Sequence, residues 1–163
     1  MNKVHLSLGS NRGDREANLG KAVKLLSEWA GNIIRLSSLY ETPPWQMTDE
    51  TNFINQVILI ETNLQAEGLL DTILQIELLM GRVRTSKGYE PRIIDIDILF
   101  YNEEIINSNK LSIPHPLLQE RRFVLEPLNE ISPDFMHPVL KKKVMQLLRE
   151  CNDKSQVKKS VSK

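Results

Sequence analysis

Two aspartates, Asp95 and Asp97, stand one residue apart in an otherwise apolar segment. The segment alternates in two rows, Ile94, Ile96, Ile98 and Phe100 in one and Ile93, Asp95, Asp97 and Leu99 in the other. This period of two predicts a strand, on which same-face side chains stand about 7 Å apart. Magnesium prefers carboxylate oxygens together with substrate phosphates, so the pair is typical of a metal–nucleotide site. For an isolated Asp-x-Asp, two solvated acids on an open sheet face would be the simpler interpretation.

A run of cations precedes the aspartates, over residues 81–92. Its cations are Arg82, Arg84, Lys87 and Arg92. Gly81 and Gly88 loosen the segment, and Pro91 disfavours helix at the residue before it. Guanidinium groups on a movable loop bind phosphoryl oxygens, and closure of such a loop excludes water. Beside Asp95 and Asp97, the run fits a phosphate-binding loop and a loop that only maintains solubility about equally well.

Composition narrows the class of protein. The chain has 163 residues and 21 residues of each charge sign, so its net charge is zero. A neutral chain argues against a dedicated nucleic-acid-binding protein. Cys151 is the only cysteine, so no disulfide forms within the chain. No apolar run reaches membrane-spanning length and the first residues do not read as a signal peptide, so we expect a cytoplasmic protein without a membrane partner.

The pattern of elements predicts an α+β fold. We expect strands over 2–8, 33–41, 53–61 and the aspartate segment, with helices after the first and third strands, in a ferredoxin-like βαββαβ order. Two buried helix stripes are expected, one of Leu19, Ala22, Val23, Leu26, Trp29 and Ala30 and one of Ala66, Leu69, Ile73, Ile76 and Met80. Both helices would cover one face of a four-stranded antiparallel sheet, and the other face would hold a substrate or the C-terminal helical and strand additions. Residues 1–155 would form a single catalytic domain, and 156–163 a frayed basic tail.

Other sequence features carry less information. Gly9-Ser10-Asn11 lacks the spacing of either glycine-rich nucleotide motif, so we interpret it as a tight turn, followed by Asp14 as a helix cap. His5, His115 and His137 lack zinc-ligand spacing. His115, held between Pro114 and Pro116, is the histidine most suited to a functional role.

Taken together, the motifs closely resemble the 6-hydroxymethyl-7,8-dihydropterin pyrophosphokinase family of folate biosynthesis. The resemblance covers residues 2 to about 138. It rests on Leu8-Gly9-Ser10-Asn11, Tyr40-Glu41-Thr42-Pro43-Pro44-Trp45, Phe53-Ile54-Asn55, Gly81-Arg82-Val83-Arg84, Pro91-Arg92-Ile93-Ile94-Asp95-Ile96-Asp97, Ile113-Pro114-His115-Pro116 and Arg121-Arg122-Phe123-Val124-Leu125-Glu126-Pro127-Leu128. The implied reaction transfers diphosphate from ATP to the hydroxymethyl group of the pterin and releases AMP. Such a transfer depends on positioning and charge neutralisation.

The resemblance also implies a nucleotide site. Asp95 and Asp97 would hold two Mg²⁺ ions that bridge the phosphates of ATP. Arg82 and Arg92 would act in catalysis or product release. The further ATP-binding residues would be Glu77, Arg84, Tyr89, Arg92, Ile98, Lys110, Leu111, Ser112, His115 and Arg121, with Ile98 and Leu111 offering backbone groups to the adenine edge.

The implied pterin site has an aromatic and a polar part. Phe53 and Phe123 would stack on the two sides of the heterocycle, and Asn55 would bind its amide edge. Thr42, Pro43 and Trp45 would shape the rim, and Asp95 would also contact the pterin.

Three positions depart from the family pattern. Leu74 stands where a glutamine is common, and Tyr89-Glu90 replaces a Trp-Gly pair, which adds a negative charge near the phosphates. Arg12 replaces an apolar residue. We expect altered kinetics of loop closure and retained activity. A nucleotide-sensing module without turnover and a two-metal phosphodiesterase remain alternatives. The phosphodiesterase would need more than two carboxylates in one place, and Glu77 is the only good candidate to join Asp95 and Asp97. The sequence identifies neither a general base nor an oligomeric state.

Overall fold

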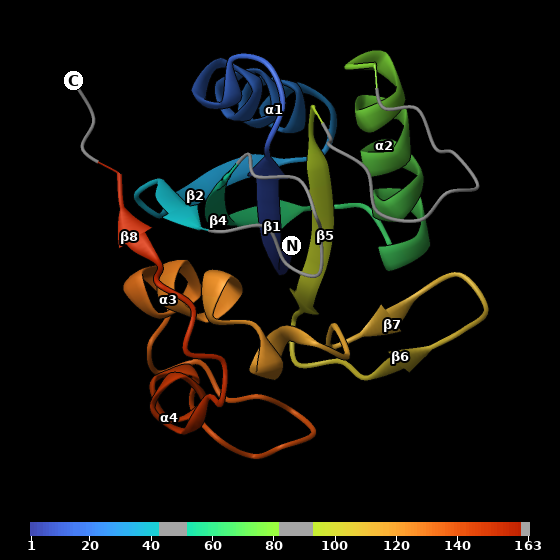
Figure 1. Cartoon of the computed structure of the whole chain (residues 1–163). Helices are drawn as coiled ribbons and strands as arrows, with labels where there is room; N and C mark the ends of the chain where they lie inside the picture. The colour runs from blue at the N-terminus through green and yellow to red at the C-terminus, as the bar shows by residue number, and fades with distance from the viewer. Residues whose placement is uncertain (43–51, 82–92, 161–163) are drawn as a thin grey trace.

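An antiparallel sheet runs through the molecule with helices on both of its faces (Figure 1). The structure is a computed structural model, and it describes residues 1–42, 52–81 and 93–160. The elements in chain order are β1 (Asn2–Ser10), α1 (Arg15–Trp29), β2 (Asn32–Leu36), β3 (Tyr40–Thr42), β4 (Phe53–Thr62), α2 (Ala66–Leu79), β5 (Asp95–Tyr101), β6 (Ile106–Asn107), β7 (Ser112–Ile113), the 3-10 turn η1 (Leu118–Glu120), α3 (Arg122–Ile131), α4 (Val144–Glu150) and β8 (Lys158–Lys159).

The strands of the main sheet follow the order β5-β1-β4-β3-β8, and β2 also pairs with β4. Each of these pairings is antiparallel. β6 and β7 form a separate hairpin near the end of β5 (Figure 1). The mixed α and β architecture and the antiparallel sheet agree with the sequence prediction.

The first core lies between the sheet and helices α1 and α2. Strand residues Val4, Leu6, Leu8, Ile58, Ile60, Ile96 and Ile98 meet helix residues Leu19, Ala22, Leu26, Leu69, Ile73 and Ile76. Asp14 caps α1, since its Oδ1 accepts a hydrogen bond from Ala17 N at 3.1 Å. The predicted helix stripes are confirmed except at Trp29, which is 45% exposed although the following residue, Ala30, is buried in the core.

The second core lies on the opposite face, under α3 and α4. It contains Val57, Leu59, Leu99 and Phe100 of the sheet with apolar residues of both helices. The prediction that Phe100 shares a row with Ile98 is wrong. The β1–β5 register shifts between His5 and Leu6, so a bulge in β5 turns Phe100 to the same face as Leu99.

Three segment boundaries differ from the expectation. The strand expected over 33–41 is divided into β2 and β3 at Ser37, whose Oγ accepts from Val57 N and whose carbonyl accepts from Gln56 Nε2. Gly9 and Ser10, expected in a turn, continue β1. In the segment expected to fray, Lys158 and Lys159 pair with β3.

The described helices include none that is both long enough and apolar enough to span a membrane.

Candidate functional site

The site is organised by a row of residues that crosses the sheet. Asp95 on β5 lies opposite Gly9 on β1, Gly9 lies opposite Asn55 on β4, and Asn55 lies opposite Tyr40 on β3. Directly opposed residues project from the same face of an antiparallel sheet. Asp97, opposite Ser7, shares this face because it is two residues from Asp95. The acids and the amide therefore converge on the face opposite to α1 and α2.

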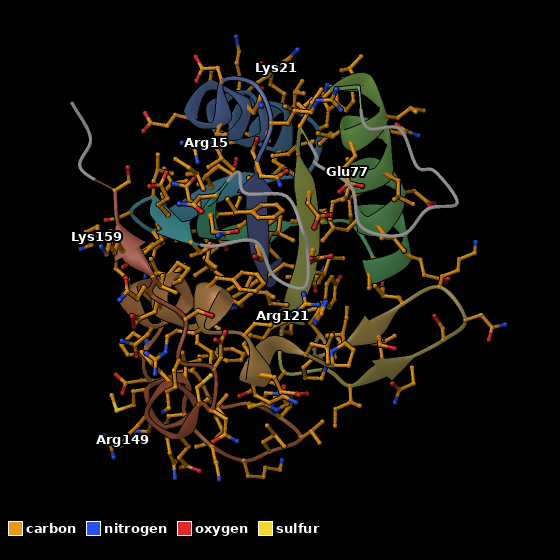
Figure 2. The ribbon with its side chains drawn as sticks, viewed as in Figure 1. Arg15, Lys21, Glu77, Arg121, Arg149 and Lys159 are labelled. Carbon is orange, nitrogen blue, oxygen red and sulfur yellow. The ribbon has the colours of Figure 1, made fainter. Side chains whose placement is uncertain are left out.

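Glu77 fixes the strand that carries the acids. It projects from α2 toward β5 (Figure 2) and is 2% exposed. Its Oε2 accepts a hydrogen bond from Ile96 N at 2.8 Å. β5 is the terminal strand of the sheet on this side, so the carboxylate satisfies a backbone donor between Asp95 and Asp97. The structure thus shows Glu77 holding the acidic strand, and its predicted contact with ATP stays a prediction.

A polar and aromatic wall stands over Gly9. Asn55 Nδ2 donates to Thr42 Oγ1 at 2.8 Å, and both side chains are buried. A Cβ on Gly9 would lie 2.8 Å from Asn55 Oδ1 and 3.5 Å from a ring carbon of Phe53. The absence of a side chain at Gly9 is therefore what lets the Asn55 amide lie over β1, whereas the distance to Phe53 is an ordinary contact. The sequence interpretation of Gly9 as a turn residue missed this role, because the close approach involves a strand far along the chain.

His115, which is predicted to bind ATP, lies beside β5. Its backbone N donates to Leu99 O at 3.0 Å, and its ring Nδ1 accepts from Leu117 N at 3.1 Å. Burial, followed by the charge of Arg121, lowers its pKa to about 4, although Asp95 acts in the opposite direction. The ring is therefore neutral near pH 7, and with Nδ1 an acceptor its proton is on Nε2, which is a hydrogen-bond donor.

Arg121 and Phe123 flank the start of α3. The Cζ atom of Arg121 lies 5.7 Å from the centroid of the Phe123 ring. In Figure 2 Arg121 lies beside the end of β5. Within the described part of the chain, Arg121 Nε is buried without a hydrogen-bond acceptor. Such a guanidinium suits an anionic ligand.

The predicted adenine and ribose contacts lie on two elements. Ile98 is buried in the first core, so only its backbone is suited to bind a ligand. Lys110, Leu111 and Ser112 belong to the β6–β7 hairpin, where Leu111 O accepts from Ser108 N at 2.9 Å. Lys110 and Ser112 are exposed, and Leu111 packs against the first core.

The remaining predicted residues lie outside the described ranges. These are Pro43 and Trp45 of the pterin rim and Arg82, Arg84, Tyr89 and Arg92 of the cationic loop. Among residues 1–42, 52–81 and 93–160, no cluster of three or more histidine, cysteine or acidic side chains forms a metal site. Asp95 and Asp97 offer two carboxylates on one strand face, a donor set that fits magnesium when its other ligands are phosphates and water.

Comparison with known proteins identifies similar sequences. Residues 5–133 match the family model described as 7,8-dihydro-6-hydroxymethylpterin-pyrophosphokinase (HPPK). A 2-amino-4-hydroxy-6-hydroxymethyldihydropteridine pyrophosphokinase of Methylorubrum extorquens is 43% identical over 137 residues, which cover 83% of this chain and 86% of that protein. The protein of the same name from Aquifex aeolicus is 41% identical over 142 residues, which cover 87% of this chain and 88% of that protein.

Longer proteins also match. The folic acid synthesis protein fol1 of Pneumocystis carinii is 44% identical over 137 residues, which are 83% of this chain and 18% of that protein. A crystal structure of Plasmodium falciparum HPPK-DHPS has a TM-score of 0.73 and 22% sequence identity. The match covers 92% of this chain and 43% of that chain, so the chain spans less than half of that protein. At this identity the structural match supports the fold.

Proposed function

The chain belongs to the 7,8-dihydro-6-hydroxymethylpterin-pyrophosphokinase family, and we propose that it transfers diphosphate from ATP to the hydroxymethyl group of 6-hydroxymethyl-7,8-dihydropterin and releases AMP. The observation that carries this proposal is the row across the sheet. The row places Asp95 on the same face as Asn55, and Asp97, two residues along β5, projects from that face as well. The proposed metal-binding acids and the proposed pterin-binding amide thus share one face, which supports a transfer between ATP and a pterin.

We propose Asp95 and Asp97 as the magnesium ligands, with two ions held between them and the phosphates. Their separation along one strand, and the hydrogen bond from Ile96 N to Glu77, support a rigid platform for the ions. When bound, magnesium neutralises phosphate charge and orients the reacting groups. The two side chains would also hold the triphosphate in one register relative to the pterin.

We assign the pterin to the wall over Gly9. Asn55 would recognise the amide edge, because its Nδ2 is oriented by Thr42 and its Oδ1 lies over Gly9. Phe53 and Phe123 would stack on the ring, which is favourable in an offset geometry. Asp95 would accept a hydrogen bond from the hydroxymethyl group. Pro43 and Trp45 are proposed rim residues.

On the nucleotide side, neutral His115 would donate a hydrogen bond from Nε2 to a phosphate oxygen. Arg121 would bind another phosphate oxygen. Its charge is close enough to lower the pKa of His115, and its Nε is buried without an acceptor among the described residues. We propose Arg82, Arg84, Tyr89 and Arg92 as further phosphate or nucleotide contacts, with Arg82 and Arg92 closest to the chemistry. Glu77, Ile98, Lys110, Leu111 and Ser112 complete the proposed ATP site. We also propose that the βαββαβ core of this sheet is ferredoxin-like.

The proposal is tested by incubating the protein with MgATP and the pterin and identifying the nucleotide product. AMP is expected; formation of ADP or of inorganic phosphate would overturn the assigned reaction. Asp97→Ala should lower kcat about a hundredfold or more while circular dichroism and the melting temperature stay close to those of the unmodified chain. Asp134→Ala, which removes an exposed carboxylate that pairs with Lys143 and is not among the proposed site residues, is the matched control.

A further inference from the structure

The C-terminal strap, defined as residues 152–160, lies outside the region matched by the family model, which ends at residue 133. It follows α4 and runs along α3 to β8 (Figure 1). One end binds α3 and the other binds β3. The strap therefore connects α3, whose first turn carries Phe123, with β3, which carries Thr42, and both residues belong to the proposed pterin site.

Asp153 makes the contact with α3. Its Oδ2 accepts from Arg122 N at 3.0 Å, and its carbonyl accepts from Arg122 Nε at 2.9 Å. Its Oδ1 accepts from Ser155 N at 2.9 Å and from Ser155 Oγ at 2.5 Å, which fixes the carboxylate in place. Although burial raises the pKa of Asp153, the hydrogen bonds from Ser155 and Arg122 lower it overall, so the group is ionised near pH 7.

The contact supplies what α3 lacks. The residue at the N-cap position, Arg121, makes no side-chain capping bond. A carboxylate that accepts a first-turn N–H satisfies an otherwise unpaired donor and interacts favourably with the positive end of the helix. Asp153 is therefore a cap provided from a distant segment. The residues on either side of the capped Arg122 are Arg121 and Phe123, which are proposed to bind phosphate and pterin.

The other end of the strap extends the sheet. Lys158 pairs with Glu41 and Lys159 with Tyr40, and Ser160 N donates to Leu39 O at 2.7 Å. β3 continues to Thr42, whose hydroxyl orients Asn55. Strand pairing at this edge restrains the backbone that places the hydroxyl.

We propose that the C-terminal strap positions the substrate site, with Asp153 as its principal positioning residue. The inference rests on the proposed function for its substrates. Without the cap, the first turn of α3 frays in a fraction of the molecules, and only the remainder presents Arg121 and Phe123 for binding. The apparent affinity for both substrates is then the intrinsic affinity multiplied by the fraction of molecules with an ordered first turn. Saturating substrate restores the ordered state.

The test compares Asp153→Ala with Asp153→Asn in the full-length chain. Asp153→Ala is expected to raise the KM for the pterin and for ATP by up to about fivefold, with kcat nearly unchanged, because the loss of a cap changes the fraying equilibrium constant by roughly fivefold and the KM rises by no more than that factor. Asp153→Asn keeps an oxygen acceptor for Arg122 N and should recover most of the affinity. Asp134→Ala should leave both KM values unchanged.

Ser160 provides a second variant that does not depend on the folding of Asp153→Ala. Ser160→Pro removes the N–H donor to Leu39 O, whereas Ser160→Ala keeps it. We expect a raised KM for the pterin only in Ser160→Pro. A lower melting temperature with unchanged KM values in both Asp153→Ala and Ser160→Pro, or a lower kcat alone, would overturn the proposal.

Amide hydrogen exchange separates this inference from the proposed function. Asp153→Ala should increase exchange at Arg122 whether or not the chain forms AMP. If the unmodified chain forms no AMP, the proposed function is wrong and the exchange result still decides the capping role. If it forms AMP and Asp153→Ala changes neither exchange nor KM, the strap inference is wrong.

Discussion

At the scale of single residues, the proposed pterin site depends on the lack of a Cβ atom at Gly9. Asn55 Oδ1 occupies the space next to Gly9, where a Cβ would lie only 2.8 Å away. Real Cβ atoms do not approach an oxygen this closely, so a side chain here must displace the Asn55 amide or the backbone of β1. Because Thr42 already orients the other end of that amide, the displacement would disturb the wall that we assign to the pterin.

Gly9→Ala is therefore expected to raise the KM for the pterin about tenfold, through loss of roughly one well-placed hydrogen bond. The KM for ATP should change little. Gly20→Ala is the matched control, because Gly20 lies in α1 with nothing within 4 Å of an added Cβ. There alanine should stabilise the helix by up to about 1 kcal/mol. Equal pterin KM values in Gly9→Ala and the unmodified chain would contradict the role of Gly9.

At the scale of elements, α3 is joined to the β2–β3 connection by Glu130. The carboxylate accepts from Ser38 N at 3.1 Å, from Ser38 Oγ at 2.9 Å and from Tyr40 OH at 2.6 Å. Burial raises the pKa of Tyr40, and the hydrogen bond to Glu130 raises it further. The Tyr40 hydroxyl therefore stays protonated as a donor at all ordinary pH values.

Glu130→Ala is expected to lower the free energy of unfolding by about 1 kcal/mol, a small value for charge-assisted bonds because the carboxylate is exposed. Urea denaturation of Glu130→Ala, Tyr40→Phe and the double variant measures the coupling, which should be at least about 0.5 kcal/mol. Glu126→Ala is the control on the same helix. It removes a carboxylate whose ion pair with Arg122 is long, at 3.9 Å, so its loss should change stability less than the loss of Glu130. Strictly additive effects of the two substitutions would show that Tyr40 and Glu130 do not stabilise each other.

The elements that the sequence predicts are those with a repeating local pattern. Alternation located β5 and placed Asp95 and Asp97 together on one face, and helical spacing identified the buried sides of α1 and α2. Local patterns do not reveal hydrogen bonds between distant segments. The cap that Asp153 places on α3 joins residues 31 apart, and the Glu130–Tyr40 bond joins residues 90 apart.

The same limit applies within the site. Family resemblance supplied its residue list, including Pro43, Trp45, Arg82 and Arg92, which lie outside the described residues. The role of Gly9 depends on where β4 lies, so neither its neighbours in sequence nor its residue type disclosed it. The bulge that turns Phe100 to the second core likewise follows from strand pairing and has no signal in the alternation.

At the scale of the whole molecule, the sheet separates two cores, and His5 lies where the second core joins β1 to the C-terminal helices. Its Nε2 is 2.8 Å from Ser132 Oγ, and its ring makes edge contacts with Phe100 and Phe135. Arg35 adds a cation nearby and donates to Ile131 O at 2.6 Å. The ring of His5 thus contacts both β5, through Phe100, and the segment that follows α3, through Ser132 and Phe135.

Burial, followed by the charge of Arg35, lowers the pKa of His5 from 6.5 to about 4. Between these pH values the unfolded chain binds a proton that the native chain does not, so the free energy of unfolding falls as the pH falls from 6.5 toward 4. The full effect for a side chain that is 3% exposed is about 3 kcal/mol. Urea denaturation at intervals across this range should therefore give a steeper pH dependence for the unmodified chain than for His5→Gln, which cannot titrate and keeps a partner for Ser132. His115 and His137, whose pKa values are also lowered, contribute equally to both curves. Parallel curves for the two proteins would show that His5 does not couple proton uptake to the opening of the second core.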